Sequence, residues 1–168
     1  TVSAKNLENS KTYTLMTDEI LKRAQTGDHL DIPYDFSSLS YLVAFMAVSS
    51  GGVISEVTKL DSEQADSALI EILKNAGVQI SLNAGGLKIE GAREHLTSLT
   101  ADASLYPDLI PTLVFLAAHI EGESKFCNLQ ILEHKESNRV KELVFLLELF
   151  EVPHRYDPKN YRLFVQGS

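Results

Sequence analysis

Four segments of the chain carry the spacing of apolar residues that helices require. Residues 62–76 and 137–150 place apolar side chains at intervals of three and four, which puts them on one helical face, and Gly77 follows the first segment as a stop signal. Residues 38–49 and 108–120 are apolar nearly all round. We therefore expect these last two helices to be buried.

Short runs between and after these helices predict strands. A glycine, Gly52 or Gly122, follows each apolar helix, and the turn sequences "NAGG" and "DPKN" join the closing pairs of runs as hairpins require. The predicted strands are residues 53–57, 79–82, 87–90, 125–129, 154–156 and 162–165.

With a short extended run at its start, each unit has the order β-α-β-α-β-β, and the order occurs twice, over about residues 28–91 and 97–167. Helices that cover a sheet bury its apolar face. We therefore expect an α/β fold (α+β in some schemes) in which helices pack against mixed sheets, with residues 28–168 in one domain. Residues 1–27 fit neither unit; their later part predicts a helix ending at Gly27, a linker or the tail of a neighbouring domain.

Composition narrows the class of protein. The chain has 168 residues, and its hydrophobic fraction of 44% is enough for a packed core. The formal net charge of −8 argues against nucleic-acid binding, which needs a basic face. Cys127 is the only cysteine, so an intrachain disulfide and a cysteine-based metal site are excluded, and we expect a reducing, cytoplasmic environment.

The longest apolar runs and the N-terminus indicate whether the chain spans a membrane and whether it is part of a larger protein. No apolar run reaches about 18 residues, so we expect no membrane span. The N-terminus has neither an apolar signal segment nor a methionine, which suggests a piece of a larger protein.

Polar residues stand at the starts of three predicted helices, in "DFSSLS" (35–40), "LYPDLIP" (105–111) and "HKESNR" (134–139). Unpaired N–H groups and the helix dipole attract anions to such starts, so three starts brought together would suit one phosphate- or carboxylate-bearing ligand. Two plainer interpretations stay open. Ser37, Ser38 and Asp108 are ordinary N-cap residues, and a Lys-Glu pair at a helix start is usually solvated.

Two of these segments also match a known pattern. Pro107-Asp108 precedes an apolar, alanine-containing helix, a glycine strand follows, and "KESNR" (135–139) opens a long helix. This arrangement resembles the enolpyruvyl transferase family, in particular the branch that acts on shikimate 3-phosphate. Asp35 in "DFSSLSY", and Ser10 and Tyr13 in "NSKTYTLMT", extend the resemblance over nearly the whole chain.

The resemblance implies a fold of two similar domains, each of three β-α-β-α-β-β units, with this chain forming about two-thirds of one domain. It implies transfer of the enolpyruvyl group of phosphoenolpyruvate to the 5-hydroxyl of shikimate 3-phosphate with release of phosphate, a step in chorismate and aromatic amino acid biosynthesis. The reaction calls for no metal and no organic cofactor, and we expect the isolated chain to be inactive.

The resemblance also assigns roles. Asp108 would lie near the accepting hydroxyl, Glu136 would donate a proton on the enolpyruvyl side, and Lys135 would contact the hydroxyl or bridge both substrates. These residue types suit proton exchange between positioned groups and the binding of two anions. The residues expected to bind substrate are Arg139, which would hold phosphoenolpyruvate, and Ser10, Tyr13 and Asp35.

Two alternatives remain at this point. A non-catalytic module would keep the fold and use its surface for protein contacts; Glu133 favours it, since the family usually has a basic or apolar lead-in before Lys-Glu. A relative acting on UDP-N-acetylglucosamine would carry a reactive cysteine loop, whereas Cys127 lies within a predicted strand. An incomplete domain exposes strand edges and apolar faces, which also favours self-association of the chain.

Overall fold

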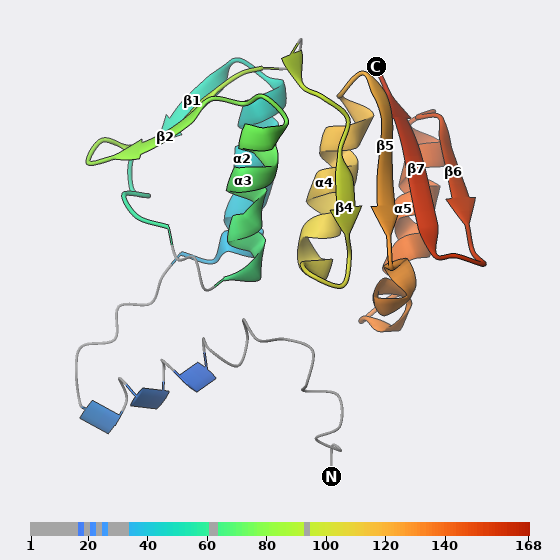
Figure 1. The fold of residues 1–168 in the computed structure, drawn as a ribbon, viewed down its shortest axis with the longest axis horizontal. Coiled ribbons are helices and arrows are strands. Elements are labelled where there is room, and N and C mark those ends of the chain that lie inside the picture. Colours follow the sequence, from blue (N-terminus) through green and yellow to red (C-terminus); the bar gives the residue numbers. More distant parts are fainter. Residues whose placement is uncertain (1–16, 19–20, 23–24, 27–33, 61–63, 93–94) are drawn as a thin grey trace.

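The computed structural model describes residues 17–18, 21–22, 25–26, 34–60, 64–92 and 95–168 (Figure 1). The helix expected before Gly27 falls largely outside these ranges, although the described residues between 17 and 26 are helical. The extended run expected at the start of the first unit lies outside them as well.

The first unit contains an antiparallel sheet in the order β1-β3-β2. A 3-10 turn, η2, leads directly into the second helix, α3. The elements are α2 (Phe36–Val48), β1 (Gly51–Ile54), η2 (Ala65–Ser67), α3 (Ala68–Asn75), β2 (Ile80–Asn83) and β3 (Gly86–Glu90).

The second unit contains a mixed sheet in the order β4-β5-β7-β6. Strands β4 and β5 pair in parallel, and the other neighbours are antiparallel. The elements are β4 (Thr100–Asp102), η4 (Pro107–Leu109), α4 (Ile110–Ala118), β5 (Gly122–Cys127), η5 (Leu129–His134), α5 (Arg139–Leu149), β6 (His154–Asp157) and β7 (Arg162–Gly167).

Helices α2 and α4 lie between the two sheets (Figure 1). Helix α2 packs against β1 and β3, α4 packs against β5 and β7, and the two helices contact each other. A buried hydrogen bond of 3.0 Å joins Ser40 Oγ on α2 to Thr112 Oγ1 on α4. Buried apolar side chains from both units belong to a single cluster, so the two units share one hydrophobic core.

Strand β7 approaches the end of α4 very closely. Gly167 is buried in β7, and a Cβ built there would collide with the main-chain carbonyl oxygens of Ala117 and Ile120. Glycine is required here because these oxygens are backbone atoms and cannot move without shifting the chain.

The order of elements follows the prediction, but several boundaries differ. The strand predicted at 125–129 begins at Gly122 and ends at Cys127, because Asn128 has a left-handed backbone (φ 58°) that breaks the strand. The strand predicted at 53–57 ends at Ile54, where a turn follows. The 3-10 helix η5 between β5 and α5 was not predicted at all.

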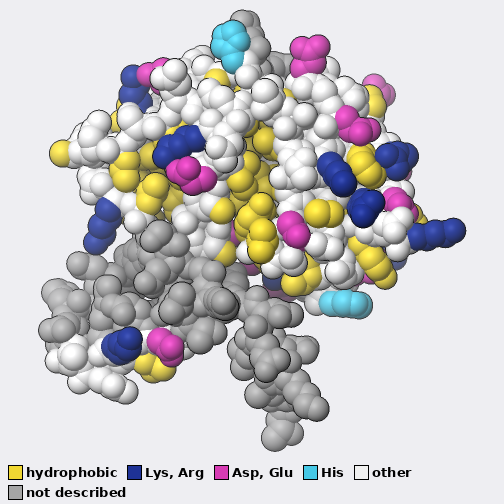
Figure 2. Space-filling view, in the orientation of Figure 1, with side chains coloured by type: hydrophobic (Ala, Val, Ile, Leu, Met, Phe, Trp, Pro, Cys, Tyr) yellow, Lys and Arg dark blue, Asp and Glu magenta, His cyan; other side chains and the backbone are white. Residues whose placement is uncertain are grey.

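The expectation of two buried helices holds for α4 and only partly for α2. Tyr41 and Phe45 of α2 are each 59% exposed, whereas Val43 and Ala44 on the same helix are fully buried. A sequence that is apolar all round cannot show which side has a neighbour. Figure 2 shows apolar side chains gathered in the middle of one face, in the region between the two sheets.

Candidate functional site

The openings of η4 and α5 meet at one cluster of charged side chains. Asp108 is in the first turn of η4, directly after Pro107, and Arg139 is the first residue of α5. Arg139 Nη1 donates to Asp108 Oδ1 at 2.6 Å. We call Asp108, Lys135, Glu136 and Arg139 the charged cluster.

Lys135 and Glu136 complete this cluster from the segment between η5 and α5. Lys135 Nζ lies 3.3 Å from Asp108 Oδ1, and Arg139 Nη2 donates to Glu136 Oε2 at 3.0 Å. Arg139 therefore bridges two carboxylates that come from segments far apart in the sequence. The four side chains to which the resemblance assigned roles are brought together, and they come from two of the three helix starts that were expected to converge.

Local structure explains why these side chains project together. Lys135 is extended (φ −80°, ψ −165°) where η5 ends, and Asn138 then caps α5 by accepting from Lys141 N at 3.1 Å. The cap fixes the first turn of α5, which carries Arg139. Residue Glu133 ahead of the motif accepts a hydrogen bond of 3.4 Å from Tyr156 Oη on β6.

The electrostatics of the cluster favour ionised carboxylates. Burial of the Asp108 carboxyl opposes its ionisation, but hydrogen bonds and charge from Arg139 and Lys135 outweigh burial and hold its pKa below the ordinary value. A hydrogen bond to its own backbone N–H, together with Arg139, lowers the pKa of Glu136. Both are therefore carboxylates at neutral pH in this state.

The opening of α2 lies near the cluster but uses its polar groups differently. Asp35 Oδ1 accepts from Ser37 N at 3.1 Å, and Asp35 Oδ2 accepts from Ser38 Oγ at 2.6 Å. Asp35 is thus the N-cap of α2. The plainer interpretation named Ser37, Ser38 and Asp108 instead and is wrong there, because both serines lie inside α2 and Asp108 lies inside η4, whose N-cap is Tyr106. Ser10 and Tyr13, the other two residues expected to bind substrate with Arg139, lie outside the described residues.

Sequence reasoning did not single out Asp66, which lies next to this region. Asp66 is only 5% exposed, and its Oδ2 accepts a hydrogen bond from Ser37 Oγ. The charges of Asp108, Asp35 and Lys135 all act on its carboxyl. Acidic residues are common at the starts of helices, so the sequence alone does not mark Asp66. What distinguishes it is its burial, which appears only in the structure.

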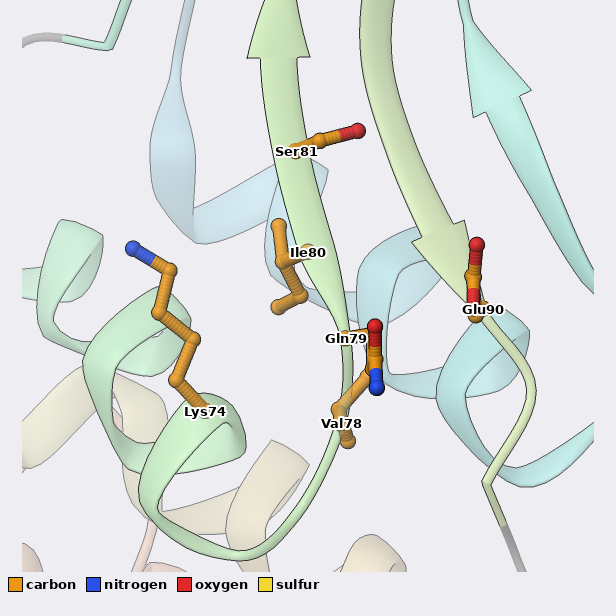
Figure 3. A pocket seen from close by; sticks show the side chains of 6 residues that line it. All are labelled: Lys74, Val78, Gln79, Ile80, Ser81 and Glu90. Carbon is orange, nitrogen blue, oxygen red and sulfur yellow. The ribbon is translucent and has the colours of Figure 1, made fainter.

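A separate hollow of about 290 Å³ lies beside the end of α3 and strands β2 and β3 (Figure 3). The charged side chains that line this hollow already form surface ion pairs. Lys74 pairs with Glu71 at 2.8 Å, and Glu90 pairs with Lys88 at 2.9 Å. It is at the opposite end of α3 from Asp66, and we do not assign it to the site. The lining residues are Lys74, Val78, Gln79, Ile80, Ser81 and Glu90.

Two further features are absent from the described part of the chain. No group of three or more His, Cys, Asp or Glu side chains there is placed to hold a metal ion. No helix in those ranges combines the length and the apolar character that crossing a membrane takes.

Comparison with known proteins identifies the pattern. The family model described as EPSP synthase (3-phosphoshikimate 1-carboxyvinyltransferase) matches residues 6–158. A 3-phosphoshikimate 1-carboxyvinyltransferase of Methanosarcina acetivorans is 40% identical over 114 residues, which are 67% of this chain and 26% of that protein. The protein of the same name from Methanococcoides burtonii is 31% identical over an alignment that covers all of this chain and 44% of the relative.

Solved structures show the same fold at lower identity. The enolpyruvyl transferase NikO from Streptomyces tendae matches with a TM-score of 0.59 and 17% identity, over 82% of this chain and 31% of that one. EPSP synthase from Acinetobacter baumannii matches with a TM-score of 0.57 and 19% identity, over 82% and 33%. The chain spans less than half the length of each of these four proteins.

Proposed function

Because this chain belongs to the EPSP synthase (3-phosphoshikimate 1-carboxyvinyltransferase) family, we propose that it forms part of an enzyme that moves the enolpyruvyl group of phosphoenolpyruvate to the 5-hydroxyl of shikimate 3-phosphate. The observation that carries this proposal is the charged cluster, in which Arg139 bridges Asp108 and Glu136. Two anionic substrates need cations, and the proton exchanges need carboxylates within reach, and the cluster supplies both.

Asp108 is proposed to act on the accepting hydroxyl. Its lowered pKa keeps it ionised at neutral pH, so it can accept a hydrogen bond or a proton from that hydroxyl. Lys135, 3.3 Å from the same carboxylate oxygen, would hold the hydroxyl and shield the charge that forms on it. Asp108 makes no capping bond to η4, whose N-cap is Tyr106, so its contacts with two cations support the proposed base role.

Glu136 is proposed to serve the enolpyruvyl side. It is ionised in this state, so it must gain a proton before it can donate one to the methylene carbon. Arrival of a phosphate-bearing anion at Arg139 would weaken the Arg139–Glu136 contact and place negative charge nearby. Both changes raise the pKa of Glu136 and favour its protonated form.

Arg139 is proposed to bind the phosphoenolpyruvate anion through its planar fork of donors. Ser10, Tyr13 and Asp35 are proposed to add substrate contacts; for Asp35 this requires that it do so while capping α2, or by releasing a cap bond. Since the chain spans less than half of its relatives, we propose that turnover belongs to a longer protein and that the isolated chain is inactive. We assign that protein to the cytoplasm and residues 28–168 to one domain with two repeated units.

Phosphate release tests the proposal directly. In the full-length gene product that contains this chain, shikimate 3-phosphate and phosphoenolpyruvate should together yield phosphate, and Glu136→Gln should lower kcat by about 10²-fold or more. Glu71→Gln is the matched control, because Glu71 also pairs with a cation three residues on but lies at α3. A folded full-length protein without phosphate release would reject the proposal and favour the non-catalytic module.

A further inference from the structure

Asp66 is buried without full use of its polar atoms. The residue is 5% exposed and Oδ2 accepts the Ser37 hydroxyl, whereas Oδ1 has almost no contact with solvent and no hydrogen-bond partner among the residues that the structure describes. A buried oxygen with no partner is costly, so such a group calls for an explanation beyond folding.

Gln64, two residues before Asp66, also makes hydrogen bonds to the opening of α2. Gln64 Oε1 accepts from Phe36 N at 2.8 Å, and Gln64 Nε2 donates to the carbonyl of Tyr34 at 2.8 Å. These two bonds bracket Asp35 on both sides along the main chain. Together with the Ser37–Asp66 bond, they fix the first turn of α2 to η2.

The same carboxyl lies within electrostatic range of the charged cluster. The charges of Asp108 and Lys135 act on Asp66, and so does the charge of Asp35 at the α2 opening. Asp66 is therefore bonded to the α2 opening through Ser37, and α2 itself packs against η4, the element that carries Asp108.

We propose that Asp66 is a positioning residue for the site: by accepting the Ser37 hydroxyl it holds the α2 opening, with Asp35 and Ser38, in register with Asp108. Its structural effect stands on the hydrogen bonds above, whereas its effect on turnover rests on the proposed function. Asp66 itself need not touch a substrate.

The charge state of Asp66 fits this role. Burial raises its pKa first of all, Asp108 and Asp35 raise it further, and the Ser37 bond and Lys135 oppose them. A raised pKa favours the protonated acid, which carries no negative charge to compete with Asp108 for Lys135. An amide of the same shape should therefore replace the acid with little loss.

Hydrogen exchange on this chain tests the structural part. In Asp66→Ala, the amides of Ser37 and Leu39, which bond to Asp35 Oδ1 and to Asp35 O, should exchange about tenfold faster. Asp66→Asn should keep both rates within about threefold of wild type. The matched control is Ser124→Ala, since Ser124 is also a buried polar residue with one bond, from Leu99 N at 2.9 Å, but lies in β5.

The outcomes separate the two proposals. Unchanged Ser37 and Leu39 rates in Asp66→Ala, or an equal change in Ser124→Ala, would overturn the positioning role. If Asp66→Ala does not fold, Ser37→Ala decides instead, because it removes the same bond from the donor side. In the full-length protein, Asp66→Ala should raise KM for either substrate at least about fivefold, with rescue by Asp66→Asn. A wild-type protein that releases no phosphate would reject the proposed function and leave the exchange result to be judged alone.

Discussion

Asp108 and Arg139, 31 positions apart in sequence, are joined by a hydrogen bond of 2.6 Å that ties the start of η4 to the first residue of α5. Both side chains are less than a third exposed. A charge-assisted bond in such a setting is stronger than a surface ion pair, and one oxygen of Asp108 also faces Lys135. The stability of the chain and the chemistry of its site therefore depend on the same contact.

Asp108→Asn should destabilise the chain, because it leaves Arg139 and Lys135 with less compensating charge. We expect the free energy of unfolding to fall by about 1–2 kcal/mol, measured by urea denaturation at neutral pH. Glu71→Gln, which removes one partner of the exposed Lys74 pair, should cost no more than about 0.5 kcal/mol. Equal losses in the two variants would contradict the special weight given to Asp108.

The contribution of Asp108 should depend on pH in a defined direction. Its pKa in the folded chain is below the ordinary value of 3.8, so its stabilising effect is complete above 3.8 and is lost as the pH falls through the folded value. The difference in unfolding free energy between wild type and Asp108→Asn should be constant from neutral pH to about 5 and shrink below about 4. Denaturation curves at pH 7, 5 and 3 would check this.

Asp66 should show the opposite sign. Its folded pKa is above 3.8, so its contribution is fully present below that value and is lost as the pH rises through the folded value. Asp66→Asn cannot ionise, so its stability relative to wild type should increase as the pH rises from about 4 to 7. A difference that is flat over this range would show that Asp66 titrates like an exposed aspartate.

Gly167→Ala should damage the packing of β7 on α4. The added methyl group would collide with the carbonyl oxygens of Ala117 and Ile120, so we expect a loss of about 2 kcal/mol or more in unfolding free energy. Gly85→Ala provides the comparison, because its Cβ would meet Asn83 Oδ1, an exposed side-chain atom that can shift at the cost of only its hydrogen bond from Gly85 N. Thermal unfolding followed by circular dichroism would distinguish them.

The sequence predicts the helices and the order of strands well because apolar spacing and turn residues act locally. Gly77 ends the α3 segment and "DPKN" joins β6 to β7, as expected. The break at Asn128 was missed because asparagine is compatible with both a strand end and a left-handed turn, and only the tertiary setting selects between them.

Part of the candidate site was also predictable, from a sequence motif rather than from apolar spacing. The residues of the charged cluster form a recognisable sequence pattern, so a resemblance is enough to propose roles for them. Asp66 could not be found in this way, because its role depends on burial against Ser37, 29 positions earlier in the chain. Long-range burial of a single polar side chain leaves no periodic trace in a sequence.

The bracket that Gln64 forms around Asp35 has an evolutionary consequence. Both hydrogen bonds of Gln64 go to main-chain atoms, so they do not depend on which side chains stand at positions 34 and 36. Tyr34 is 53% exposed, so other residue types at this position would leave the α2 opening held by the same main-chain bonds. Homologues should vary widely at position 34 and retain glutamine, or another side chain able both to give and to take a hydrogen bond, at position 64.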